Sequence, residues 1–231
     1  MIKDLHSTLR SNVKLNAVYT ALQESVKGDD DGTGKNVLSA TELFLSSLTA
    51  LEGTIQRENP TGEMELLQLL EYSLSSHNVN EEIFHSQFSL LSRVLRAALQ
   101  AHTDDDNTEN GGNSNALLRQ ISNVSQCALT LLPRNEKEAS RLLNDCILSL
   151  FRSSSPKIRR CAHGNCMVLL QETSGMQNVF STVVGEYAQN VIKQCAKQFE
   201  HIRHEDIPKV MHILNFMQGA LVYFPVSAYI A

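Results

Sequence analysis

The sequence lacks several features that mark common classes of protein. It has no Trp and only five Pro in 231 residues, and about half of its 11 Gly gather in two polar patches. An all-β fold needs turn residues at regular intervals, so this distribution disfavours it. No apolar run approaches the roughly 18 residues that a membrane-spanning helix requires. The charged start, MIKDLHSTLR, is also unlike a signal peptide.

Cysteine is scarce, and acidic residues outnumber basic ones. The five Cys, at positions 127, 146, 161, 166 and 195, lie inside apolar helical patterns and show no disulfide-like spacing. We therefore expect a reducing compartment, the cytosol or the nucleus. The formal net charge of −5 argues against nucleic-acid binding by bulk charge, although a local basic patch would still allow it.

What the chain does contain is helical periodicity almost throughout. Apolar residues recur at a spacing of three and four, and strand-like alternation is nearly absent. This pattern predicts an all-α fold of about nine helices. They are Asn12–Val26, then segments carrying Leu38–Ile55, Leu66–Leu74, Phe84–Leu99, Leu117–Leu132 and Leu142–Leu150, a helix from Pro156, and two more at Asn178–Phe199 and Asp206–Tyr223.

Several of these helices carry start signals, and two polar segments separate them. The predicted caps are Thr61, Asn80, Asn135 (with Glu138 as a capping box), Ser114, and Ser155 followed by Pro156. The segments near 28–35 and 102–113 offer no apolar anchor, and we expect both to be flexible loops.

Paired helices recur about every 40 residues, the period of HEAT and armadillo units. We therefore expect residues 1–231 to form one HEAT/armadillo-like α-solenoid of about four to five helix pairs. Similarity between the units is limited to their apolar pattern, so a compact helical bundle stays open as the alternative.

The segment Ser153–Glu172, SSSPKIRRCAHGNCMVLLQE, carries the most specific pattern. It resembles the second helix of a HEAT repeat, in which Pro is followed by a β-branched residue, Arg and a small residue. Here these positions are Pro156, Ile158, Arg159 and Ala162. We expect Ile158, Cys161, Ala162, Val168 and Leu169 to face the preceding helix, and Arg159 to bond groups in the neighbouring repeat.

The resemblance extends over three consecutive helices. PKIRRCAHGNCMVLLQ, STVVGEYAQNVIKQCAKQFEH and KVMHILNFMQGALVYFP are similar to helices near the N-terminus of the ribosomal-RNA-processing protein twelve family, and KLNAVYTALQESV and TELFLSSLTALE are more distant matches. Members of that family are long HEAT-repeat factors of ribosome biogenesis. The resemblance implies that this chain is an N-terminal segment of such a protein.

The resemblance also implies a function. It points to a non-enzymatic scaffold that binds pre-ribosomal particles and aids small-subunit rRNA processing and pre-ribosome export. The expected partners are pre-ribosomal proteins, pre-rRNA and nuclear transport factors, in the nucleolus and nucleus with shuttling to the cytoplasm. A transport-receptor-like HEAT adaptor that binds only proteins is the main alternative, and a small helical enzyme domain is a third.

Motifs for other chemistry fail on spacing. The stretch GDDDGTGKN has Asp29 and Asn36 where a phosphate loop needs Gly and Ser or Thr, and calcium loops from Asp29 or Asp106 lack the final Glu. On one helix, Cys161, His163 and Cys166 point in different directions and cannot share a zinc ion. We therefore predict no cofactor, metal, membrane or small-molecule substrate.

One cluster is a candidate binding site. Basic residues outnumber acidic ones between Arg134 and Arg160, at Arg134, Lys137, Arg141, Arg152, Lys157, Arg159 and Arg160. We predict that Arg152, Lys157 and Arg160 form an exposed edge that meets RNA phosphates or an acidic partner, and that Arg159 is buried. The alternative is that these are helix-end charges and salt bridges between repeats.

Overall fold

The computed structural model describes residues 39–56, 62–76, 78–103, 111–131, 133–171 and 177–198, together with residues 207, 208, 210, 211, 214 and 215. This part contains α-helices, one 3-10 helix and no strand, which confirms the all-α prediction for it. The predicted helix Asn12–Val26 and the loop at 28–35 lie outside the described residues. The predicted helix Asp206–Tyr223 is described at only those six positions, all helical. The chain divides into two compact units, Met1–Asp104 and Asp105–Ala231.

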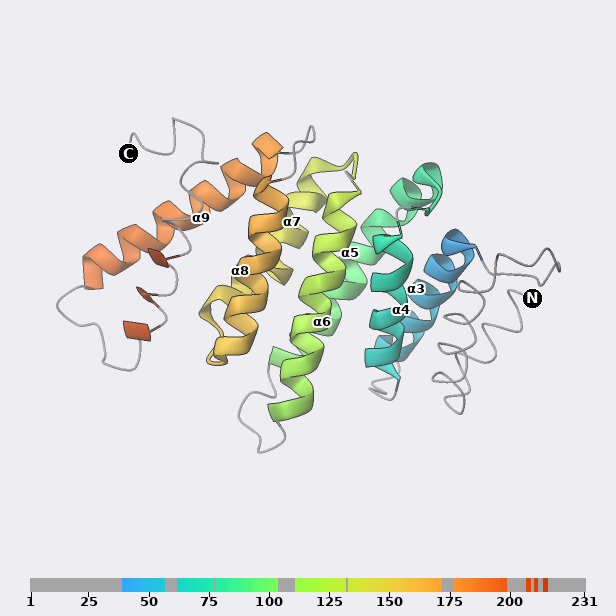
Figure 1. The fold of residues 1–231 in the computed structure, drawn as a ribbon, viewed down its shortest axis with the longest axis horizontal. Helices are drawn as coiled ribbons and strands as arrows, with labels where there is room; N and C mark the ends of the chain where they lie inside the picture. The colour runs from blue at the N-terminus through green and yellow to red at the C-terminus, as the bar shows by residue number, and fades with distance from the viewer. Residues whose placement is uncertain are drawn as a thin grey trace. The chain divides into compact units, whose positions relative to one another are not determined.

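The first unit contains three described helices, α3 (Ala40–Gln56), α4 (Glu63–Ser75) and α5 (Glu81–Thr103). Helix α3 contacts both α4 and α5 (Figure 1). Three buried rings lie in their core, with centroids 6.1 Å apart for Phe44 and Phe84 and 5.7 Å apart for Phe84 and Phe88. Burial of each such side chain contributes about 1.5–3 kcal/mol, so these rings are a main source of stability in the unit.

Side chains satisfy the backbone at two helix starts of this unit. The amide of Ile83 donates to Asn80 Oδ1 at 3.1 Å, so the predicted Asn80 cap is confirmed. Ser39 and Glu42 form a reciprocal capping box before α3. The predicted cap Thr61 lies outside the described residues, and the N-cap of α4 is Gly62, which makes no side-chain bond. Its φ of 87° is left-handed, a conformation that Gly adopts without a steric cost.

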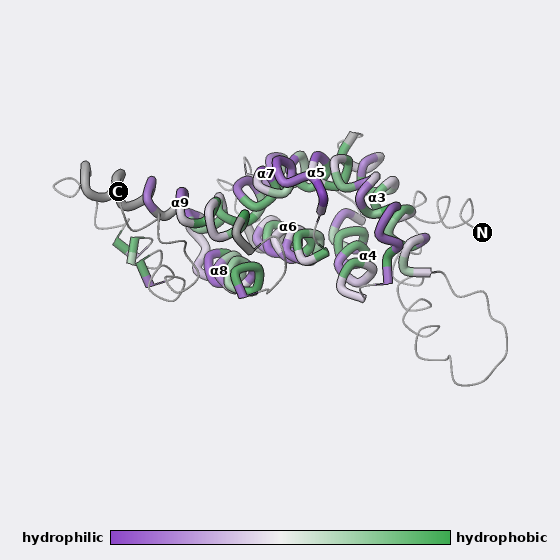
Figure 2. Tube along the Cα trace, turned by 90° about the horizontal axis from the view of Figure 1, so that it is seen from above, coloured by the Kyte–Doolittle hydropathy of each residue, from purple (hydrophilic) through white to green (hydrophobic). Residues whose placement is uncertain are grey.

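The second unit contains α6 (Gly111–Thr130), α7 (Glu136–Cys146), the 3-10 helix η1 (Leu148–Arg152), α8 (Pro156–Gln171) and α9 (Gln177–Gln198). Helix α6 contacts α7 and α8, and α9 contacts α7 and α8. Within this unit α6 and α8 form one row and α7 and α9 form the other (Figure 2). Contacts between helices one and two places apart in the chain are consistent with a helical repeat.

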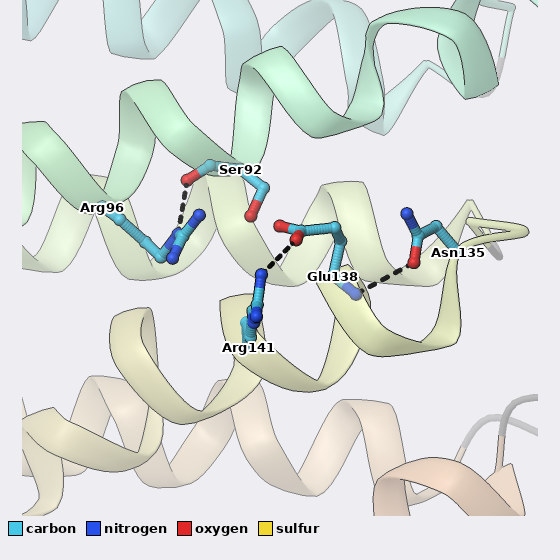
Figure 3. A network of polar contacts seen from close by, with 5 residues as sticks. All are labelled: Ser92, Arg96, Asn135, Glu138 and Arg141. Atoms are coloured by element: carbon cyan, nitrogen blue, oxygen red, sulfur yellow. Dashed lines mark hydrogen bonds and ion pairs between the residues drawn. The ribbon is translucent and has the colours of Figure 1, made fainter.

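Most predicted starts in this unit are confirmed. Pro156 is the first residue of α8, and α9 lies within one residue of its predicted bounds. Asn135 Oδ1 accepts from the Glu138 amide at 3.2 Å, but the Glu138 carboxylate binds Arg141 instead of completing a capping box (Figure 3). Ser114 does not begin α6, which starts at Gly111, and Leu150 lies in η1 because α7 ends at Cys146.

The predicted loop from His102 to Asn113 was too long at both ends. His102 and Thr103 belong to α5, and Gly111 already belongs to α6. His102 continues the buried face of α5 and its Nε2 lies 2.9 Å from Glu63 Oε2. A buried polar contact between α4 and α5 therefore lies where polar composition suggested a loop. Residues 104–110 lie outside the described part.

The buried positions of α4, α6 and α8 follow one register. Every buried position of α4 recurs in α6 at a constant spacing along the chain, and six buried positions of α6 recur in α8 at another constant spacing. The α4 set is Glu63, Leu66, Leu67, Leu69, Leu70, Ser73 and Leu74, which match Leu118, Ile121, Ser122, Val124, Ser125, Ala128 and Leu129 of α6. The α6 set Leu117, Leu118, Ile121, Ser125, Ala128 and Leu129 matches Ile158, Arg159, Ala162, Cys166, Leu169 and Leu170 of α8. The three helices therefore bury equivalent faces.

Candidate functional site

The proposed repeat motif lies at the start of α8. Pro156 is exposed at the first helical position, while Ile158 and Ala162 are fully buried. Arg159 is only 7% exposed, which is unusual for a guanidinium and requires hydrogen-bond partners. The side chains that define the motif therefore belong to the core of the second unit, apart from Pro156.

Arg159 fastens the turn that precedes its own helix. Its Nη1 donates to the carbonyl oxygens of Ser153 and Ser154 at 2.7 and 2.8 Å. Both acceptors lie between η1 and α8, so these two bonds do not reach a neighbouring repeat, contrary to the prediction for Arg159. Charge-assisted bonds to carbonyls are among the stronger hydrogen bonds, so the connection between η1 and α8 is held firmly.

A polar seam joins α8 to α6. Asn165 Nδ2 donates to Ser122 Oγ and to Asn123 Oδ1, both at 3.0 Å, and the Cys161 thiol donates to Asn123 Oδ1 at 3.2 Å. Cys161 therefore faces α6 and not, as predicted, the preceding helix. Val168, also predicted to face the preceding helix, is 40% exposed.

We use the name basic strip for Arg152, Lys157 and Arg160, all of which are exposed. Arg152 ends η1, and Lys157 and Arg160 are the second and fifth residues of α8, whose first turn contains no acidic residue. The sequence from Cys146 through Gln171 has no Asp or Glu at all. By contrast, α3, α4, α5 and α7 each carry Glu in the first turn, where it stabilises the helix dipole.

Tyr187 of α9 supports Arg152. The Arg152 guanidinium carbon lies 5.9 Å from the Tyr187 ring centroid, within the range of a cation–π contact. Tyr187 also packs edge-on against Phe151, with ring centroids 5.7 Å apart. Burial raises the pKa of Tyr187 and the nearby Arg152 charge partly offsets this effect. Sequence reasoning missed this contact, because no local pattern pairs η1 with α9.

The remaining cations of the predicted cluster lie elsewhere, around the start of α7. Arg134, Lys137 and Arg141 are exposed, and Arg141 Nη1 binds Glu138 Oε1 at 2.7 Å (Figure 3). Glu136 and Glu138 stand among them in the first turn of α7. Acidic residues therefore offset the positive charge around the start of α7, whereas the segment that carries the basic strip contains no Asp or Glu.

The residues once considered as zinc ligands have other surroundings. The His163 ring packs against Phe151 with centroids 4.2 Å apart, and burial raises the pKa of the Cys166 thiol well above its usual range. Across the described ranges, no group of three His, Cys, Asp or Glu residues could hold a metal ion. Nor is any helix of those ranges long and apolar enough to cross a membrane.

A second polar pair, buried in the first unit, also escaped sequence reasoning. Glu63 and His102 have side chains only 5% and 11% exposed, and Glu63 Oε1 has no hydrogen-bond partner. The signal that could have found His102 is its helical spacing from Ala98 and Leu99, which continues the buried face of α5.

Comparison with known proteins yields no family model, curated protein or solved structure that matches the chain significantly.

Proposed function

We propose that the chain is a HEAT-type solenoid segment that acts as a non-enzymatic scaffold in ribosome assembly, like the family it resembles in sequence. In this role it binds pre-ribosomal particles in the nucleolus and nucleus. The scaffold then aids small-subunit rRNA processing and export of pre-ribosomes. Its partners are pre-ribosomal proteins, pre-rRNA and nuclear transport factors.

The observation that carries the solenoid part of the proposal is the shared register of α4, α6 and α8. The same pattern of buried positions occurs in three helices, each separated from the next by one helix or by α7 and η1. A compact bundle has no need to repeat one buried pattern, whereas a solenoid stacks equivalent units and reuses it.

The start of α8 supports the HEAT assignment in particular. The resemblance to HEAT repeats implies a structural role for Arg159. Its side chain is buried and donates to two carbonyl oxygens of the turn before α8. Ala162 is fully buried on the same helix, where a small side chain permits close approach of a neighbour. Arg159 therefore holds the turn within a helix pair, and Ala162 belongs to the packed face.

The partner class follows from the resemblance together with the surface charge. Stacked helices present long surfaces for macromolecules, and the chain concentrates exposed cations on the basic strip. Long-range attraction by such a strip speeds encounter with polyanionic particles and weakens as salt is raised.

Sedimentation of tagged full chain from cell extract tests the proposal. The expected result is co-sedimentation with particles that contain small-subunit pre-rRNA, measured by hybridisation across the gradient. A fusion to a fluorescent protein is expected in the nucleolus. Recovery of nuclear transport factors without pre-rRNA would favour the protein-only adaptor and contradict a role in ribosome assembly.

A further inference from the structure

We infer that the basic strip binds single-stranded RNA, with Lys157 and Arg160 on the phosphates and Arg152 stacked against a base. The choice of RNA among polyanions rests on the proposed function, and the contacts themselves rest on the geometry of the second unit.

The basic strip carries positive charge that its own segment of the chain does not neutralise. Lys157 and Arg160 form no ion pair with any described residue, and the sequence between Cys146 and Gln171 supplies no carboxylate to neutralise them. Lys157 in the first turn of α8 opposes the helix dipole, with Arg160 just beyond that turn, and this arrangement is mildly unfavourable without an external anion. Phosphates of a nucleic-acid backbone are anions that would relieve this cost.

The three cations of the basic strip are held on an ordered stretch of backbone. Lys157 and Arg160 are three residues apart on α8 and therefore lie on one side of the helix. Arg152 ends η1, and the turn between η1 and α8 is held by the two carbonyl bonds of Arg159. The backbone that carries the three cations is thus ordered before any ligand binds, which lowers the entropic cost of binding.

The surroundings of Arg152 favour RNA over an acidic peptide as the ligand. The Arg152 guanidinium carbon lies 5.9 Å from the Tyr187 ring centroid, and the side chain is exposed to solvent. A planar guanidinium held in this way can stack on an unpaired base, and unstacked bases on Arg or aromatic planes are typical of RNA recognition. An acidic peptide would bind the N–H edge of the guanidinium through its carboxylates and offers no base to stack on its face.

Charge reversal tests the phosphate contacts. Fluorescence anisotropy of labelled oligouridylate, about 16 nucleotides long to cover one binding site, would be measured with the whole chain. The test variant is Lys157→Glu with Arg160→Glu. The matched control is Arg134→Glu with Lys137→Glu, which makes the same change in net charge at exposed positions around the start of α7.

We expect the test variant to lose RNA affinity and the control to retain most of it. Each phosphate contact on a single strand contributes about −0.7 to the slope of log K against log salt, so loss of two should flatten the slope by about 1.4. Between 50 and 200 mM salt, two phosphate contacts predict roughly a 7-fold loss of affinity for the native chain, against almost no loss for the variant. Circular dichroism would verify that both variants fold.

A third variant isolates the stacking step. Arg152→Lys keeps the charge and loses the planar group, so RNA affinity should fall by several-fold while the salt slope stays unchanged. If the native chain and this variant bind RNA with equal affinity, Arg152 does not stack on a base, and the reason to prefer RNA over an acidic peptide is lost.

The outcomes separate this inference from the proposed function. If the charge-reversed variant binds oligouridylate as tightly and with the same salt slope as the control, the strip does not bind RNA. If the native chain prefers poly-glutamate to oligouridylate, the strip is a site for acidic proteins and the inference is overturned. Co-sedimentation with pre-rRNA particles in either case would leave the proposed function standing.

Discussion

The buried pair between Glu63 and His102 allows a sharp test of how the first unit is stabilised. The two side chains join the first turn of α4 to the last turn of α5, and Glu63 Oε2 lies 2.9 Å from His102 Nε2. At the matching position of its buried register α6 carries Leu118 and α8 carries Arg159. The position therefore accepts an apolar side chain in one helix, which suggests the replacement Glu63→Leu.

The expected free energies follow from burial. Removal of one partner of a buried ion pair leaves the other uncompensated and costs roughly 3–5 kcal/mol, whereas replacement of both by apolar residues is often neutral. We expect Glu63→Leu and His102→Leu to destabilise the chain by about 3 kcal/mol each, and the double variant to lie within about 1 kcal/mol of the native chain. The coupling energy should thus be about 5 kcal/mol or more, above the roughly 0.5–3 kcal/mol that is usual for residues in contact.

Urea denaturation followed by circular dichroism gives the free energy of unfolding for all four proteins of this double-mutant cycle. The exposed pair Arg93–Glu52 is the comparator. Its atoms lie 2.8 Å apart, yet the two side chains are 66% and 27% exposed, so solvent limits its coupling to about 0.2–1 kcal/mol. Similar coupling energies for the two pairs would refute the argument that burial, rather than distance, sets the strength.

Three other outcomes follow from packing. Ala162→Leu should destabilise by roughly 1–3 kcal/mol in a thermal melt, because Ala162 is fully buried; the control Gly164→Leu, in open space on the same helix, should show no such loss. Gly164→Ala should raise the free energy of unfolding by about 0.5–1 kcal/mol, since Ala is the better helix former, and a lower value would mean that Gly164 is needed for close approach. Cys166 should react with a thiol reagent only after unfolding, because burial raises its pKa, whereas the partly exposed Cys161 should react before it. Equal reaction rates of the two thiols in the native chain would contradict the burial of Cys166.

The helices themselves were largely predictable, since their signals are local. Asn80 and Asn135 cap the amides three residues ahead, and Pro156 fits the first turn of α8 because its missing N–H has no partner to lose. A cap depends on residues within one turn, so the sequence contains all the information it needs. The N-cap of α4 is Gly62 in a left-handed conformation, which the local sequence pattern did not predict.

The candidate site was predictable in part. Exposure of Arg152 and Lys157 and burial of Arg159 agree with their helix positions, although their roles stay predictions. The partners of Arg159 were not foreseen, because a long side chain can reach either its own turn or another helix. Helical spacing predicted that Val168 faces the preceding helix, yet it is 40% exposed.

The sequence by itself determined that the chain is helical, where most helices begin, and that basic residues gather near α8. Those features depend on propensity, periodicity and charge, which act within a few residues. Only the tertiary structure decided that Glu63 meets His102, 39 residues away, and that Tyr187 of α9 supports Arg152 of η1. Such pairs form only when packed helices bring distant side chains out of water together, and no local pattern encodes which partners will meet.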